Sequence, residues 1–127
     1  MSDGGWVGVD LDGTLARYDG WKEGVIGEPI TLMQARVREW LARGIEVRIM
    51  TARASGDGAE REISLIKRWC QEHLGQELEV TCCKDYQMVE IWDDRAVRVV
   101  KNTGLISDGK DVQDTLLEDS GDIGGIM

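Results

Sequence analysis

The chain has a single histidine, His73, among its 127 residues. A Ser-His-Asp triad needs a histidine beside its nucleophile, and a multi-histidine metal site needs several, so this scarcity argues against both classes of site. His73 falls late in a helical pattern, where a histidine suits the negative end of the helix dipole. We therefore expect it to be structural.

Cysteine is scarce as well: Cys82 and Cys83 are adjacent, and Cys70 stands apart. An odd number of cysteines with no second pair argues against a disulfide framework and for a reducing cytoplasm. Neighbouring strand residues face opposite ways, which disfavours a metal or redox site at the adjacent pair. We expect all three to be buried thiols that pack as small hydrophobic side chains.

Long apolar runs and an excess of basic residues are both missing. No run approaches the ~20 residues of a membrane helix, and the N-terminus shows no secretion signal, so we expect no membrane partner. The net charge is −9, whereas a generic nucleic-acid binder is basic. Residues 107–127 hold six acids against one lysine, so a single nucleotide or a nucleic-acid end remains compatible with the rest of the chain.

What remains is an ordinary composition, 42% hydrophobic and 31% charged, in a chain long enough for one domain with a real core. Hydrophobic periodicity is lost after Gly104. We expect a single domain over residues 1–106, followed by an acidic C-terminal tail over residues 107–127, in a cytoplasmic protein.

The most informative stretch begins with an apolar run, Trp6 to Val9, which predicts a buried strand. Asp10 and Asp12 follow it directly. Residues two apart on a strand share a face, and two carboxylates held close repel each other unless a cation or a proton lies between them. Mg²⁺ prefers such oxygen ligands. The alternative is a simple turn, because Asp12 precedes Gly13 and Asp-Gly is common turn chemistry.

Patterns typical of strands and helices alternate along the rest of the chain. The sequence predicts strands at residues 6–10, 45–50, 78–83, 89–92 and 97–100, and helices at 31–43 and 59–74. This alternation predicts an α/β fold with a Rossmann-like parallel sheet flanked by helices. Residues 84–88 are too few for a crossover helix, so the third strand ends early or the return is nearly extended or one tight turn.

Sites in parallel α/β sheets lie beyond the carboxyl ends of the strands. The polar residues directly after the predicted strands are Asp10, Asp12, Thr51, Arg53, Lys84, Asp93 and Asp94. We expect them to gather on one rim of the sheet.

Residues 13–28 form a glycine-rich stretch without a clear period, and loops this long in compact domains are usually functional or mobile. Two of its aromatic residues, Tyr18 and Trp21, have two interpretations. They either pack the loop onto the body or stack on a substrate ring.

Taken together, these residues resemble the haloacid dehalogenase (HAD) superfamily of aspartate-nucleophile phosphatases. Its four motifs follow in order as Asp10-Leu11-Asp12-Gly13-Thr14-Leu15, Met50-Thr51-Ala52-Arg53, Lys84, and Ile91-Trp92-Asp93-Asp94. The chain is also similar to the phosphatase domain of polynucleotide kinase-phosphatases and to small phosphatases of phage and bacterial genomes. Neither place where the family inserts a cap domain is long enough here, so the resemblance implies a capless, HAD-like fold.

The resemblance implies a Mg²⁺-dependent phosphomonoester hydrolase. Asp10 would be the nucleophile that forms an aspartyl-phosphate, and Asp12 the acid and base that serves the leaving group and then the water. Thr51 and Lys84 would bind the phosphate and offset its charge.

The family holds its metal with the first aspartate, the backbone carbonyl of the second, and an acid of the fourth motif. Here these are Asp10, Asp12, and Asp93 or Asp94, and alternation favours only one of the last two. Arg53 has two interpretations: it either clamps a phosphate oxygen of the substrate or forms an ion pair.

An open site suits a large substrate with a protruding phosphate, or a small phosphorylated molecule shielded by a partner subunit in a homo-oligomer. We expect a nucleotide or a 3′-phosphorylated nucleic-acid end. The alternatives are a non-catalytic HAD-like binding or assembly module and a phospho-receiver domain. In a receiver the phosphorylated aspartate normally closes the third strand, where this chain has Cys83-Lys84.

Overall fold

The computed structural model describes residues 4–107 of the chain. The chain divides into two compact units, Met1–Asp94 and Arg95–Met127. All regular secondary structure in the described residues belongs to the first unit. The expected boundary after residue 106 stays a prediction, because the tail beyond Ser107 lies outside the described residues.

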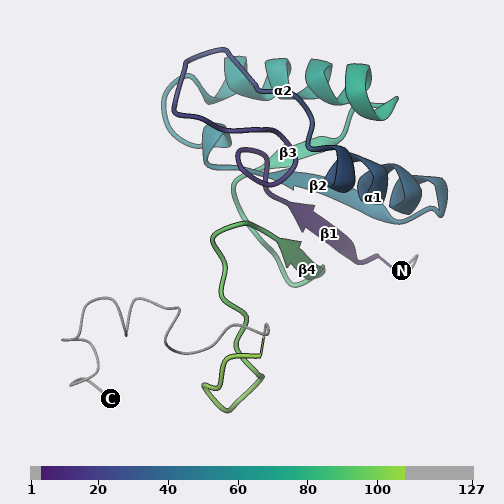
Figure 1. The fold of residues 1–127 in the computed structure, drawn as a ribbon, viewed down its shortest axis with the longest axis vertical. Helices are drawn as coiled ribbons and strands as arrows, with labels where there is room; N and C mark the ends of the chain where they lie inside the picture. The colour runs from purple at the N-terminus through teal and green to yellow at the C-terminus, as the bar shows by residue number, and fades with distance from the viewer. Residues whose placement is uncertain (1–3, 108–127) are drawn as a thin grey trace. The chain divides into compact units, whose positions relative to one another are not determined.

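The first unit is built on a four-stranded, all-parallel sheet with the strand order β3-β2-β1-β4 (Figure 1). Its elements are β1 (Trp6–Val9), α1 (Thr31–Ala42), β2 (Glu46–Met50), the 3-10 turn η1 (Ala52–Ala54), α2 (Ala59–Leu74), β3 (Glu79–Thr81) and β4 (Met88–Trp92). The predicted α/β class with a Rossmann-like parallel sheet and flanking helices is therefore confirmed.

Both helices cover the same face of the sheet, and the core lies between the sheet and the helices. Val7 and Val9 of β1 and Val47 and Ile49 of β2 alternate along their strands, so all four point to one side. They form one hydrophobic cluster with the inward side chains of the helices, which are Met33, Val37, Ile66, Trp69, Cys70 and Leu74.

The opposite face carries no helix in the described part of the chain. Trp6 lies there beneath Arg48, whose guanidinium carbon is 4.4 Å from the centre of an indole ring. Arg48 also forms ion pairs with Glu46, Glu79 and Asp85 at 2.7, 3.4 and 3.7 Å. A cation–π contact and three ion pairs therefore take the place of a second helical layer at this point.

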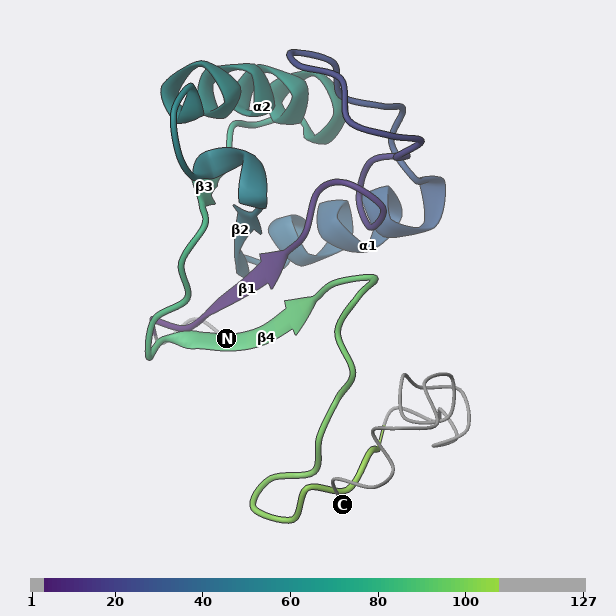
Figure 2. The ribbon, with the colours of Figure 1, turned by 90° about the vertical axis from the view of Figure 1, so that its left-hand side faces the viewer.

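The return from β3 to β4 crosses this second face. Strand β3 ends at Thr81, earlier than the predicted Cys83, and residues 82–87 run to the start of β4 without a helix (Figure 2). Asp85 anchors this connection to β1, because its Oδ1 accepts a hydrogen bond of 2.9 Å from Trp6 Nε1. Because β3 ends early, the connection to β4 is longer than the five residues that the sequence predicted.

Two expectations are wrong in detail. Residues 97–100 form no strand, and Val99 makes only an isolated antiparallel bridge to Ile106. Cys70 is buried, as expected, and burial raises the pKa of its thiol to about 12. Cys82 and Cys83 are exposed instead, because β3 has already ended.

Neither helix that the structure describes has the length and apolar character needed to cross a membrane.

Candidate functional site

The strand order reverses at β1. From β1 the chain builds outward through β2 to β3, then returns to place β4 on the other side of β1. Ligands of open α/β sheets bind beyond the carboxyl ends of the strands at such a switch point. The backbone N–H of Asp10 donates a 2.9 Å hydrogen bond to the carbonyl of Trp92, so the ends of β1 and β4 lie side by side.

Three carboxylates meet at this point. One side-chain oxygen each from Asp10, Asp93 and Asp94 lies within 4.8 Å of the others. Asp10 and Asp93 are half-buried and Asp94 is exposed. The sequence named all three residues as candidate metal ligands, with only one of Asp93 and Asp94 expected to bind directly, and the structure brings all three together.

Thr14, which sequence reasoning did not single out, links the two ends of this cluster. Its hydroxyl accepts a 2.9 Å hydrogen bond from the backbone N–H of Asp94. The same hydroxyl lies 3.2 Å from Asp10 Oδ2 and 3.1 Å from Asp94 Oδ1, and it has one proton to donate between them.

A tight turn places Thr14 there. The backbone N–H groups of Thr14, Leu15 and Ala16 all donate to the carbonyl of Leu11. Gly13 has a φ of +90°, in the left-handed region, and a Cβ built on it would lie 2.8 Å from Asp94 Oδ2. Only a glycine fits between this turn and the carboxylate.

The cluster perturbs Asp10 strongly. Burial, then the side-chain hydrogen bond with Asp94 and the charge of Asp93, raise the pKa of Asp10 from 3.8 to about 7, while the hydrogen bond from Thr14 opposes them. A cation between the carboxylates would relieve this repulsion. Oxygen donors with net negative charge suit Mg²⁺, so Asp10 with Asp93 or Asp94 fits a magnesium site.

Asp12 does not join this cluster through its side chain. The strand ends at Val9, so the chain turns and the two aspartates diverge, with Asp12 directed to η1. Arg53 Nε and Nη2 donate to its two carboxylate oxygens at 2.8 and 2.9 Å, a bidentate pair. The expected ligation by the backbone carbonyl of Asp12 stays a prediction.

The ion pair that the sequence left open for Arg53 is thus present. Its remaining contacts are with Glu62 Oε1 at 3.0 Å and the carbonyl of Val25 at 2.9 Å. The hydrogen bonds to Asp12 and Glu62 raise the pKa of Arg53 although burial lowers it. These contacts use four of the five N–H groups of Arg53. One N–H group is left to bind a phosphate oxygen, so the phosphate-clamping role stays a prediction.

Glu62 gave a weak signal in the sequence, as an acid on the apolar face of α2. It is 6% exposed. Among the described residues every buried side-chain nitrogen and oxygen has a hydrogen-bond partner. The pair Arg53 and Glu62 is therefore a satisfied polar network rather than a site of strain.

Thr51 and Lys84 differ in how firmly the structure places them. Thr51 is buried at the end of β2, and its hydroxyl accepts a 3.1 Å hydrogen bond from the N–H of Arg53, which leaves its own proton for another acceptor. Lys84 is exposed on the β3–β4 connection, and within the described residues it makes no hydrogen bond or ion pair. Its phosphate-binding role stays a prediction.

A cavity of about 130 Å³ opens beside Asp12, between η1 and the loop that follows β1. Its lining residues are Asp12, Arg17, Tyr18, Asp19, Gly20, Lys22, Val25, Gly27 and Arg53. Enclosing pockets for ligands measure roughly 300–1,000 Å³. This cavity therefore holds part of a ligand rather than a whole nucleotide.

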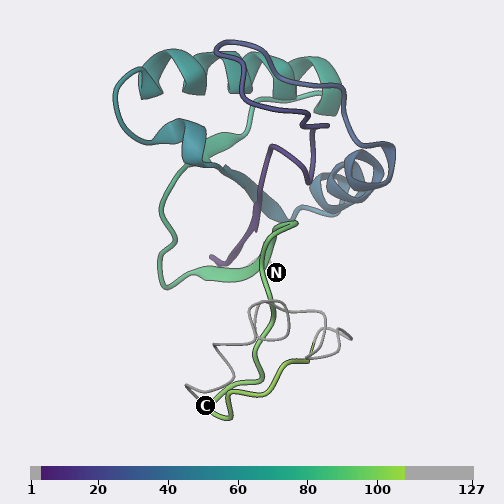
Figure 3. The same ribbon diagram turned by 60° about the vertical axis from the view of Figure 1, so that its left-hand side comes forward.

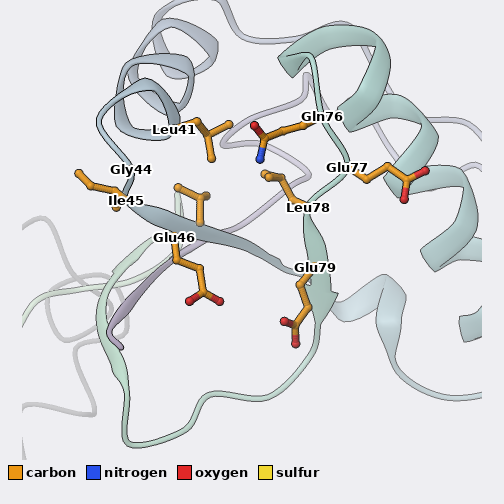
Figure 4. A pocket seen from close by; sticks show the side chains of 9 residues that line it. Leu41, Gly44, Ile45, Glu46, Gln76, Glu77, Leu78 and Glu79 are labelled. Carbon is orange, nitrogen blue, oxygen red and sulfur yellow. The ribbon is translucent and has the colours of Figure 1, made fainter. Parts of the chain in front are cut away.

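A larger cavity, of about 330 Å³, lies away from the carboxylates, between the amino ends of β2 and β3 (Figure 4). Its polar lining consists of Glu46, Gln76, Glu77 and Glu79, beside the apolar Leu41, Ile45, Val47 and Leu78. No basic residue of the described chain lines it. Its three glutamates would repel a phosphate.

Comparison with known proteins supports the fold alone. No family model matches the chain, and no curated protein matches it. A solved structure of a conserved protein from Bacteroides thetaiotaomicron is similar, with a TM-score of 0.51 and 19% identity over 72% of this chain and 76% of that one. At this identity the likeness concerns the arrangement of helices and strands.

The turn at Gly13 yields a test of the carboxylate cluster. We expect Gly13→Ala to weaken Mg²⁺ binding at least about tenfold, because its methyl group displaces the Asp94 carboxylate. Isothermal titration with Mg²⁺ measures this. Gly44→Ala is the matched control, since Gly44 has a φ of +83° and nothing within 4 Å of an added Cβ. Both variants lose about 1–2 kcal/mol of stability, and equal Mg²⁺ affinities would contradict the cluster geometry.

The raised pKa of Asp10 has a consequence for stability. The folded pKa of about 7 lies above the ordinary value of 3.8, so the folded state binds the extra proton. The contribution of Asp10 is full below the ordinary value and is lost as pH rises through the folded value. In chelator-treated protein we expect the melting temperature, relative to that of Asp10→Asn, to fall between about pH 4 and about pH 7. Added Mg²⁺ should remove this pH dependence. If the melting temperatures of the wild type and Asp10→Asn change in parallel with pH in the absence of Mg²⁺, the pKa of Asp10 is not raised.

Proposed function

We propose that the protein is a Mg²⁺-dependent phosphomonoester hydrolase of the HAD type, without a cap domain, that works through an aspartyl-phosphate. The observation that carries this proposal is the meeting of Asp10, Asp93 and Asp94 at the switch point of a parallel sheet. The order of the sequence motifs, Asp-x-Asp-Gly-Thr-Leu, Thr, Lys and Asp-Asp, agrees with this assignment.

Mg²⁺ held by Asp10 and by Asp93 or Asp94 would neutralise the charge of the substrate phosphate and of the nucleophile. It would also keep Asp10 ionised, since a nearby cation lowers the pKa that burial and the neighbouring acids raise. Asp10 is suited to be the nucleophile because it directly follows β1 and its Oδ2 is oriented by the hydroxyl of Thr14.

In the first step a carboxylate oxygen of Asp10 attacks phosphorus, and the bond from phosphorus to the leaving oxygen breaks. Asp12, in its protonated form, gives its proton to that oxygen. In the second step a water attacks phosphorus, Asp12 takes the proton of the water, and the bond to Asp10 breaks to release inorganic phosphate. Each oxygen of Asp12 retains a lone pair beyond its bond to Arg53 for these transfers.

The remaining phosphate oxygens need donors of positive character. The proton of the Thr51 hydroxyl and the ammonium of Lys84 fill this role in the proposal, Lys84 by movement of its exposed connection. The small cavity beside Asp12 would receive the leaving group. Its size favours substrates that extend into solvent, such as a phosphorylated nucleic-acid end.

One observation favours a second candidate, a non-catalytic HAD-like binding module. Arg53 engages both oxygens of Asp12, and Lys84 is exposed on the connection between β3 and β4. A measured turnover decides between the two candidates.

We expect Asp10→Asn to lower the hydrolysis of p-nitrophenyl phosphate in the presence of Mg²⁺ by at least about 10³-fold, because the amide cannot attack phosphorus. Asp57→Asn is the control, since Asp57 is an exposed aspartate between η1 and α2. Activity of Asp10→Asn close to that of the wild type in pure protein would refute the aspartyl-phosphate route.

The substrate class is tested by a panel of 3′-phosphorylated oligonucleotides, mononucleotides and sugar phosphates, assayed by phosphate release. We expect the highest kcat/KM for the oligonucleotide, because its phosphate protrudes and the rest of the substrate lies outside the small cavity. A strong preference for sugar phosphates with no turnover of nucleotides would reject a nucleic-acid substrate while leaving the hydrolase intact.

A further inference from the structure

The arginine beside the site is almost completely buried. The side chain of Arg53 is 3% exposed. An isolated buried charge is strongly unfavourable, so its partners must be permanent. One of these partners is Asp12, held through both oxygens in a fork that fixes the plane of the carboxylate.

Glu62 holds the other side of the guanidinium. Its Oε1 accepts from Arg53 Nη1 at 3.0 Å, and its Oε2 accepts from the backbone N–H of Gly24 at 3.2 Å. The two oxygens of Glu62 thus join η1 and α2 to the loop after β1. Without Glu62, Arg53 would keep one buried carboxylate partner instead of two.

The loop that follows β1 closes the network from outside. Trp21 lies over the guanidinium, with 4.7 Å between the centre of the ring and Arg53 Cζ, while 56% of Trp21 remains exposed. The carbonyl of Val25 accepts from Nη2 of Arg53. The indole of Trp69 on α2 donates a 3.0 Å hydrogen bond to the carbonyl of Gly27. The loop after β1 therefore lies against α2, as its course in Figure 3 shows.

We infer that Arg53, fixed by Glu62 and by the loop over residues 21–25, is a positioning residue that holds the Asp12 carboxylate for proton transfer. The inference rests on the proposed function. It assigns Arg53 a role other than clamping the substrate phosphate, and it gives Glu62 a part in the reaction although Glu62 lies outside the cluster of Asp10, Asp93 and Asp94. An aspartate released from the fork rotates freely about its side-chain bonds, and its proton transfers become slow.

The identity of the leaving group separates this role from general damage. p-Nitrophenolate leaves without a proton, whereas the alkoxide of glycerol 2-phosphate needs one. We expect Arg53→Lys, which keeps the charge but loses the fork, to lower kcat/KM for glycerol 2-phosphate by about 10²-fold or more and for p-nitrophenyl phosphate by less than about tenfold. Glu62→Gln, which keeps an acceptor for Arg53, should show the same pattern with smaller losses.

A second readout concerns the hydrolysis of the aspartyl-phosphate, which needs Asp12 as a base. In Arg53→Lys we expect a rapid initial release of p-nitrophenolate close to one equivalent per active site, because the second step becomes rate-limiting. Arg61→Lys is the matched control: Arg61 lies next to Glu62, is exposed, and within residues 4–107 forms an ion pair with Glu23 alone.

The outcomes are distinct. A wild-type protein that hydrolyses neither substrate overturns the proposed function, and the inference with it. A wild type that hydrolyses both, with Arg53→Lys and Glu62→Gln losing equally on the two substrates or on neither, overturns the inference alone. If Arg53→Lys fails to fold, the substrate dependence of Glu62→Gln decides.

Discussion

The fold holds like charges together. Asp10, Asp93 and Asp94 have oxygens within 4.8 Å of one another, and burial together with these neighbouring acids raises the pKa of Asp10 to about 7. A sheet in which β1 and β4 are direct parallel neighbours imposes this arrangement, because both strands end at the same level. A divalent cation would offset this unfavourable arrangement. The function proposed for the site depends on such a cation.

The backbone, more than the side chains, fixes the geometry of the cluster. Three N–H groups converge on the carbonyl of Leu11, and the resulting turn carries Thr14 back to the cluster. The hydroxyl of Thr14 then accepts a hydrogen bond from the N–H of Asp94, which lies 80 positions further along the chain. Buried hydrogen bonds of this kind need little adjustment when a ligand arrives, which is the sense in which a site is preorganised.

Much of this was predictable from the sequence, because hydrophobic periodicity and the carboxyl-end rule depend only on residue order. The α/β class, both helices and the proximity of Asp10 to Asp93 and Asp94 follow from those two rules. The direction of the Asp12 side chain does not. It depends on where β1 ends, and a strand that stops at Val9 sends the two aspartates apart.

The pairing of Arg53 with Glu62 was equally hidden, since Glu62 lies nine residues away on another element. Its place on the apolar face of α2 hints at burial but does not name its partner. The predicted strand at residues 97–100 failed for a related reason. Alternating valines satisfy a strand pattern, but a strand also needs a neighbouring strand to pair with, and a single bridge to Ile106 does not provide one. Pairing over long range is a property of the whole chain.

The helix-free face of the sheet gives the two sides of this small protein opposite responses to ionic strength. Arg48, with its three acidic partners and the indole of Trp6, holds that face largely by electrostatic attraction, which dissolved ions screen. The face under the helices is held by hydrophobic contact, which salts such as sulfate strengthen. A sulfate salt therefore strengthens the hydrophobic contacts under the helices while it weakens the ion pairs on the opposite face of the sheet.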